Sequence, residues 1–578
     1  RRNALSGCPR RTLMRDWGLR AVALAGVAVV TITETLGTFG ALRPVPLAIC
    51  WAIALVVIGW RLGRPPRLRI PFDPCVWAVL AGAGLVLALT GVTAVFSPPN
   101  SADAMAYHLP RVVYWAEQAS VRFFPTPYLN QIMLQPFAEY CVLHTYLLAG
   151  GDWLANLVQW TASVISVAGV SAIAGRFGAS VRGQAAAALF CATAPCGVLA
   201  SSGAKNDYVL AMWMVLAVYF ALGVRERADW NPIICLGAAA GLAMLTKATA
   251  FLFLPWPLLV ILGWRPSRRL ALAAVIAATL NAPQWVRNVG LSGSPMGFDS
   301  AQGDGFFRWR NERFGWGPTV SNVLRNGSEQ LGQRSERWNR AVYAGVVGLH
   351  ERLGLDPNDP DTTWRWTRYA APRNANHEAD APNLWHLAIL ALAFCLGRGR
   401  QRLYLAALAC GFVAFCAYLK WQPFMARLFL PLIVLGAPAV AAVVDRLGRR
   451  VVVTAALCLF LLDVARRPAL DNWVRPLRGE RSVLRVARED QYFSDMGQWA
   501  NADAYRRTVE RVAGSGRRTV GIDAAHLQLE YPLEALLRRR VADVRFLHTG
   551  VRNASSRYAQ PVEGPPGLVV CLDCAGDA

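Results

Sequence analysis

Apolar stretches of about 16 to 22 residues recur along most of this 578-residue chain. A helix of roughly 20 apolar residues is long enough to cross the hydrocarbon core of a bilayer. Polar turns and loops, many rich in arginine, separate the stretches. We therefore predict thirteen membrane-spanning helices, over residues 18–36, 44–60, 75–96, 153–174, 183–201, 207–223, 231–246, 249–264, 268–284, 384–397, 402–419, 427–444 and 450–465.

The arginine residues between these stretches predict the orientation of the chain. Cytoplasmic loops of membrane proteins carry an excess of Lys and Arg. If the basic N-terminal segment, residues 1–17, is cytoplasmic, every loop on its side carries at least two arginines. Those loops are 61–69, 176–182, 225–227, 265–269, 398–402 and 446–450.

Three longer segments then lie on the outer side: the loops 97–152 and 285–383, and the tail 466–578. In the tail, alternating and β-branched residues predict short strands, and one segment has helical periodicity. The strands are expected at 519–522, 544–547 and 568–571, and the helix at 529–540. The predicted fold is an all-α polytopic membrane domain over 18–465 with outer loops, followed by a small C-terminal α/β domain.

Composition agrees with this interpretation and excludes other classes. Of the residues, 54% are hydrophobic and 17% charged, whereas a soluble protein has about 25% charged residues. The net charge of +23 does not indicate nucleic-acid binding, because the arginines are spread over loops and form no basic module. Most of the 13 cysteines lie in apolar stretches. The single CxxC pair, Cys571 and Cys574, has too few ligands for structural zinc and favours a local disulfide or free thiols.

The most informative polar string is NSADAMAYHLPR, residues 100–111, just beyond the third predicted span. It begins like a helix, which Pro110 disturbs further on. In a helix, Asp103, Tyr107 and Arg111 lie on roughly one face. A carboxylate at a helix N-terminus stays ionised, as a base or an anchor for an acceptor hydroxyl requires. A simple helix cap explains Asp103 equally well.

Basic residues also gather at the predicted outer ends of the spans. A buried cation at such a depth costs a few kcal/mol unless it is paired, so function is the first hypothesis, and snorkelling to the interface is the alternative. Four cations on one side indicate a phosphate-binding chamber. They are Lys247, Arg287, Lys420 and Arg427. Asp207 follows Lys205 at another outer turn, where an ordinary solvated turn is the alternative.

The string from Asp103 to Val112 resembles the first-loop signature of bacterial GT-C-type glycosyltransferases. These enzymes are related to glycosyltransferase family 39, the protein O-mannosyltransferases, and to the lipid A aminoarabinose transferases. The resemblance covers nearly the whole chain from about residue 18, although Ala104 and Ala106 depart from the signature. Supporting strings follow in order at 124–126, 136–139, 151–160, 205–207, 245–247, 285–288, 356–360, 377–378, 421–427 and 530–533.

The resemblance implies an enzyme of the bacterial inner membrane that uses a polyprenyl-phosphate sugar at a periplasmic active site. An acceptor hydroxyl would attack the anomeric carbon, with inversion, while Asp103 takes or orients its proton. Cationic side chains would hold the leaving phosphate. The substrate-binding candidates are Tyr107, His108, Arg111, Glu139, Lys205, Asp207, Lys247, Arg287, His377, Glu378, Lys420 and Arg427.

The sequence shows no convincing set of metal ligands. We therefore expect no metal or other cofactor, although paired acidic residues leave a divalent cation open. The expected partners are the polyprenyl-phosphate sugar donor, the lipid bilayer and a glycan, lipid or protein acceptor, with no nucleic acid. A transporter or lipid flippase is the alternative; it predicts internal repeats and broken helices near mid-membrane, and the sequence shows no repeat. A non-catalytic scaffold is a third hypothesis.

Overall fold

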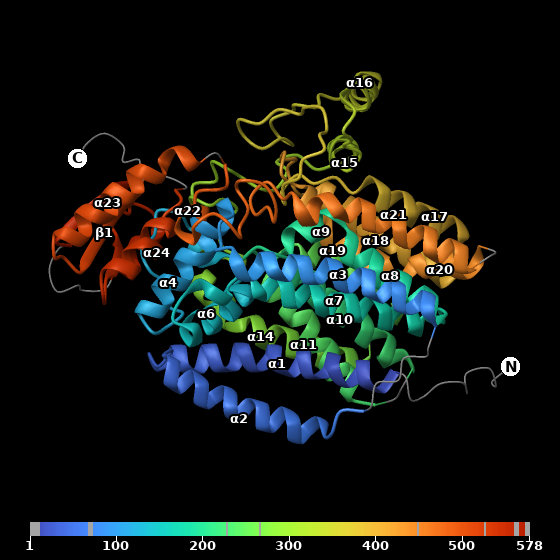
Figure 1. Cartoon of the computed structure of the whole chain (residues 1–578), viewed down its shortest axis with the longest axis horizontal. Coiled ribbons are helices and arrows are strands. Elements are labelled where there is room, and N and C mark those ends of the chain that lie inside the picture. Colours follow the sequence, from blue (N-terminus) through green and yellow to red (C-terminus); the bar gives the residue numbers. More distant parts are fainter. Residues whose placement is uncertain are drawn as a thin grey trace.

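The computed structural model describes residues 12–66, 73–226, 229–264, 267–447, 450–496, 498–524, 528–559 and 566–572. Most of the long helices run side by side in one bundle, and the C-terminal sheet lies at one end of it (Figure 1). Helices α15 (Trp316–Glu329) and α16 (Glu336–Leu353) lie at the top of the view, and α15 packs against the bundle, where Asn322 donates to the Cys416 carbonyl oxygen at 2.9 Å.

The bundle contains a helix, or a run of short helices, in every range predicted to span a membrane. Its elements are α1 (Thr12–Thr38), α2 (Pro44–Leu62), α3 (Pro74–Phe96), α7 (Leu157–Arg176), α8 (Val181–Thr193), α9 (Pro195–Ala200), α10 (Asp207–Glu226), α11 (Asn231–Thr246), α12 (Ala250–Phe253), α13 (Pro255–Leu262), α14 (Arg268–Ser292), α17 (Leu384–Leu396), α18 (Arg400–Tyr418), η3 (Ala426–Phe429), α19 (Leu430–Gly436), η4 (Ala437–Val440), α20 (Ala441–Arg446) and α21 (Arg450–Leu470).

Seven helical segments of the described chain are both long and apolar enough to cross a membrane. Three further apolar helices, α11, α12–α13 and α17, have between 10 and 17 residues. Helix α14 is long, but it carries Asn281, Gln284 and Arg287. The predicted helices are therefore present, whereas the number of thirteen membrane spans stays a prediction.

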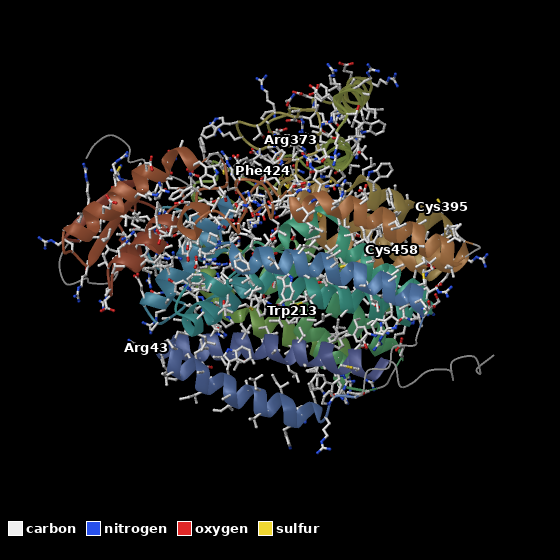
Figure 2. The ribbon with its side chains drawn as sticks, viewed as in Figure 1. Arg43, Trp213, Arg373, Cys395, Phe424 and Cys458 are labelled. Carbon is white, nitrogen blue, oxygen red and sulfur yellow. The ribbon has the colours of Figure 1, made fainter. Side chains whose placement is uncertain are left out.

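Helix α10 lies at the centre of the bundle, and its Trp213 is 1% exposed (Figure 2). Helices α11 and α14 approach each other closely through small residues. A Cβ atom on Gly237 would lie 2.7 Å from the Ala273 carbonyl oxygen, and one on Gly241 would lie 2.7 Å from the Ala277 Cα atom. Both positions therefore require glycine.

The three predicted outer segments bind one another through hydrogen bonds. The Leu129 amide of the first loop donates to Ala301 of the second at 2.9 Å, and Asn100 Nδ2 donates to Gln491 of the tail at 2.9 Å. Their helices are η1 (Ala104–His108), α4 (Leu109–Glu117), α5 (Asn130–Met133), α6 (Phe137–Ala149) and η2 (Asp152–Leu154) in the first loop, α15 (Trp316–Glu329) and α16 (Glu336–Leu353) in the second, and α22 (Arg488–Gln491), η5 (Gln498–Asn501), α23 (Ala502–Gly514), α24 (Tyr531–Arg540) and η6 (Ala554–Tyr558) in the tail.

The tail contains a three-stranded parallel sheet in the order β2-β1-β3. Its strands are β1 (Thr519–Ala524), β2 (Arg545–His548) and β3 (Leu568–Leu572). All three agree with the predicted strands to within two residues, and α24 lies inside the predicted helix. Cys571 in β3 is disulfide-bonded, and Cys574 lies outside the described residues.

The tail packs on the first outer loop through buried polar contacts. His548 binds Glu530 at 2.8 Å and the Pro125 carbonyl oxygen at 2.9 Å. Arg538 pairs with Glu117 of α4 at 2.6 Å. The loop that carries Asp103 is therefore held between the bundle and the tail.

One carboxyl group at this contact predicts a pH dependence of stability. Glu534 is fully buried with no hydrogen-bond partner for either carboxyl oxygen among the described residues. Burial, together with the charges of Glu530 and Glu117, raises its pKa well above the ordinary 4.5. As pH rises above 4.5, the unfolded chain ionises there while the folded chain stays protonated, so stability falls. We expect Glu534→Gln to flatten the decline of the thermal unfolding midpoint between pH 5 and 8; an equal slope in both proteins would contradict this.

Candidate active site

Asp103 lies at the start of a helical segment, as predicted, but the first turn of that segment is wide. Residues Ala104–His108 form a π-helical turn, in which the Leu109 amide donates to the Ala104 carbonyl oxygen. Such turns are rare and occur often at functional sites. The wider turn rotates later residues about the axis. Tyr107 therefore stays beside Asp103, whereas Arg111 contacts the carbonyl oxygens of Gln131 and Leu134.

Pro110 explains how this turn is tied to the rest of the protein. Proline lacks the amide that would bond to the carbonyl oxygen four residues earlier, at Ala106. Gln131 Nε2 donates to that oxygen at 3.0 Å and to Glu530 of the tail at 2.6 Å. Gln131 of α5 thus provides the donor that the Ala106 carbonyl oxygen lacks within the helix, and it links the π turn to the tail.

Three carboxylates meet four cations next to this turn. Asp103 pairs with Arg427 of η3 at 2.5 Å, and Asp207, the first residue of α10, pairs with Lys247 at 2.5 Å. Glu378 binds Lys205 at 2.6 Å and also Arg475. The seven side chains come from the first loop, the ends of α10 and α11, η3, the second loop and the tail. We call this group the charged chamber.

The ion pairs of the chamber also interact electrostatically with one another. Burial raises the pKa of the Asp103 carboxyl, but the charges of Arg427, Lys205 and His108 outweigh it and hold that pKa well below its usual range. Arg427 also acts on Asp207 and Lys247. Asp103 is therefore a carboxylate at every physiological pH, which meets the first requirement for a base or a hydroxyl anchor.

Exposure separates the members of the chamber into two sets. The side chains of Asp103, Lys247 and Arg427 are 24%, 21% and 16% exposed. Asp207 and Glu378 are 2% and 1% exposed. The first set can meet a substrate, and the second holds the cations in place. Tyr107 borders the first set; burial and the Asp103 charge raise the pKa of its hydroxyl well above 10, so it remains a donor.

Three other predicted residues form a buried group behind the turn. His108 Nδ1 lies 2.6 Å from Glu139, and Arg111 lies 3.4 Å from the same oxygen. Burial raises the pKa of Glu139, but the charges of His108 and Arg111 outweigh it and lower the pKa overall. Because all three side chains are at most 3% exposed, they support the Asp103 turn and do not face a substrate space.

The remaining candidates pair with carboxylates outside the charged chamber. Arg287 makes a bidentate pair with Glu34 of α1 at 2.8 Å. Lys420 binds Glu312 at 2.7 Å and so ties α18 to the second loop. His377 lies 3.1 Å from Asp495 of the tail, which also accepts the Ala102 amide. Arg287 and Lys420 therefore pair with carboxylates outside the charged chamber, and their part in binding a phosphate stays a prediction.

Several residues that pair with these candidates were not predicted from the sequence. Glu34 gave a usable signal, because a carboxylate within a predicted span is rarely incidental. Arg475 and Asp495 gave none, since both lie among many polar residues of the tail. Of the described residues, no group of three or more His, Cys, Asp and Glu side chains is placed to hold a metal ion.

The sequence pattern of the family described as dolichyl-phosphate-mannose-protein mannosyltransferase matches residues 136–285. The predicted resemblance to glycosyltransferases of this kind is confirmed. The matched segment is about a quarter of the chain and includes Glu139, Lys205, Asp207 and Lys247. Asp103 and Arg427 lie outside it.

Two solved structures resemble the chain in overall shape. The crystal structure of ArnT from Cupriavidus metallidurans bound to undecaprenyl phosphate is 17% identical, with a TM-score of 0.48. The apo form of the same protein is 16% identical, with a TM-score of 0.47. Each comparison covers 84% of this chain and 88% of the other. The comparison with curated proteins gave no match.

Proposed function

We propose that this protein is a membrane glycosyltransferase that transfers a sugar from a polyprenyl-phosphate donor to an acceptor hydroxyl. The observation that carries the proposal is the pair of Asp103 and Arg427, an ionised carboxylate and a cation that remain accessible at the ends of apolar helices. The match to a family named for a lipid-phosphate sugar donor supports the same chemistry.

In the proposed reaction, the acceptor hydroxyl oxygen forms a bond to the anomeric carbon of the donor sugar. The bond from that carbon to the phosphate oxygen breaks, and the electron pair leaves with the polyprenyl phosphate. Asp103 takes or orients the hydroxyl proton, which is worth about 10²–10⁴-fold for a general base. Attack opposite the leaving group inverts the anomeric centre.

The cations of the chamber have a second role in this proposal. Arg427 and Lys247 are the accessible cations, and they would hold the departing phosphate and offset its charge. Lys205 is buried and paired with Glu378, so its charge would act on the phosphate without direct contact. No step requires a metal, because two cationic side chains can bind a phosphate monoester.

The proposed location is the periplasmic side of a bacterial inner membrane, with the N-terminus in the cytoplasm. The arginine-rich loops support this orientation. The tail and both large loops bind one another around Asp103, so they would lie together on the periplasmic side.

The direct test is sugar transfer by the purified full-length chain in lipid, with a panel of radiolabelled polyprenyl-phosphate sugars and a crude envelope extract as acceptor. We expect enzyme-dependent loss of label from one donor and release of free polyprenyl phosphate. Turnover of no donor, together with donor movement across sealed vesicles, would replace the proposal with the flippase alternative.

A further inference from the structure

A basic groove lies outside the charged chamber, next to the first residues of α16. Two adjoining cavities form it, of about 630 and 650 Å³, and they share five lining residues. The shared residues are Gln333, Arg334, Asn374, Arg466 and Arg467. The walls come from the start of α16, the segment 374–385 and the end of α21.

The two cavities differ in chemistry. The first adds Arg478 and Asp471, so that four arginines line it. Arg478 pairs with Asp471 and Arg466 with Asp463, so two positive charges are in excess. The second cavity adds apolar side chains, among them Trp338, Leu384 and Trp385. One groove thus offers a cationic compartment beside an apolar one, which is the pattern of an amphiphile with an anionic head.

The walls of the groove are held firmly. Asn339 exchanges two hydrogen bonds with the Gln333 backbone, at 2.9 and 2.7 Å. A Cβ atom on Gly332 would lie 2.3 Å from the Arg373 carbonyl oxygen, so these two backbone segments touch. Figure 2 shows Arg373 among the polar side chains of the loops. The compartment is therefore preformed.

The place of the groove also fits a lipid. Its apolar compartment includes the first residues of α17 and the last turns of α21, two apolar helices of the bundle. Trp338 and Trp385 are 45% and 46% exposed. Exposed tryptophan beside arginine at the end of apolar helices is typical of the headgroup level of a bilayer.

From these observations we infer that the groove is a binding site for the phosphate headgroup of an anionic membrane lipid. Arg334, Arg466 and Arg467 bind the phosphate, and Trp338 and Trp385 contact the first carbons of the lipid. Segment 374–385 forms one wall of the groove, and its Glu378 binds Lys205 and Arg475 in the chamber. The groove and the chamber therefore share this chain segment, and the lipid site is separate from the proposed donor site.

The test is lipid binding by the full-length chain, measured by native mass spectrometry with phosphatidylglycerol, phosphatidylcholine or soluble glycerol phosphate. We expect the wild type to prefer phosphatidylglycerol. The triple variant Arg334→Gln, Arg466→Gln and Arg467→Gln should bind it on the order of 100-fold more weakly. The matched control changes three exposed arginines of the tail, Arg507, Arg511 and Arg518, to Gln and should bind like the wild type.

Equal affinity of the groove variant and the wild type for phosphatidylglycerol would overturn the inference. Glycerol phosphate binding as tightly as the lipid would overturn the lipid assignment. If the triple variant does not fold, Arg334→Glu alone reverses one charge at an exposed side chain and should still weaken phosphatidylglycerol binding. Because the readout is binding, the result is independent of sugar transfer.

Discussion

Replacing Asp103 with Asn is expected to reduce the sugar-transfer kcat by about 10²–10⁴-fold. The substitution keeps the shape of the side chain and removes its charge, so that it can no longer take or orient a hydroxyl proton. Donor KM should change much less, because Arg427 and Lys247 remain to hold the phosphate. The measurement is initial-rate transfer of labelled sugar at several donor concentrations.

Asp359→Asn is the matched control. Asp359 also forms an ion pair with an arginine, Arg313, but in the second loop outside the charged chamber; the Asp359 side chain is 20% exposed, similar to that of Asp103. We expect its kcat to equal that of the wild type. Since the pKa of Asp103 is held well below its usual range by Arg427 and Lys205 despite burial, the rate should show no acidic limb from Asp103 between pH 5 and 8. Full activity of the Asp103 variant would remove this residue from the mechanism.

Element positions could be predicted closely from the sequence. The length of the apolar stretches predicts helices such as α2 and α3, and short β-branched runs bounded by turns predict β1 and β3. These signals are local, so one sequence is enough to read them. The number of membrane spans is harder, because α14 and α21 carry polar residues and their place relative to a bilayer depends on their neighbours.

The pairing of charges could not be predicted, because it depends on contacts between distant segments. Asp103 and Arg427 are separated by more than 300 residues, and the sequence carries no signal that joins them. The same reasoning made Lys420 and Arg427 look equivalent, although Glu312 binds the first outside the chamber. The π turn was also not predicted, because Pro110 indicates a disturbed helix but does not indicate that the Leu109 amide bonds to the Ala104 carbonyl oxygen.

The second large effect is expected on stability, from Glu378→Gln. Glu378 is 1% exposed and binds two cations, Lys205 and Arg475, which are 4% and 0% exposed. Removing one partner of a buried ion pair costs about 3–5 kcal/mol, because the remaining charge is buried without compensation. Here two cations lose their partner at once. We expect a marked drop in the thermal unfolding midpoint of the detergent-purified protein.

Two comparisons make this result specific. Glu312→Gln removes the half-exposed partner of Lys420 and should cost no more than about 1 kcal/mol. Adding Arg475→Met to Glu378→Gln should recover part of the lost stability, because one uncompensated cation is removed and replaced by an apolar side chain. Equal unfolding midpoints for Glu378→Gln and the wild type would show that Glu378, Lys205 and Arg475 are not buried together as described.

The activity of the Glu378 variant then shows whether Glu378 holds the site in place or contacts the substrate. If Glu378 holds Lys205 and the second loop in place, the folded fraction of the variant should transfer sugar with a reduced kcat, and Arg475→Met should raise both stability and rate together. If Glu378 contacted the substrate, the second substitution would restore stability without restoring the rate. The near-complete burial of Glu378, beside the accessible Asp103, favours the first outcome.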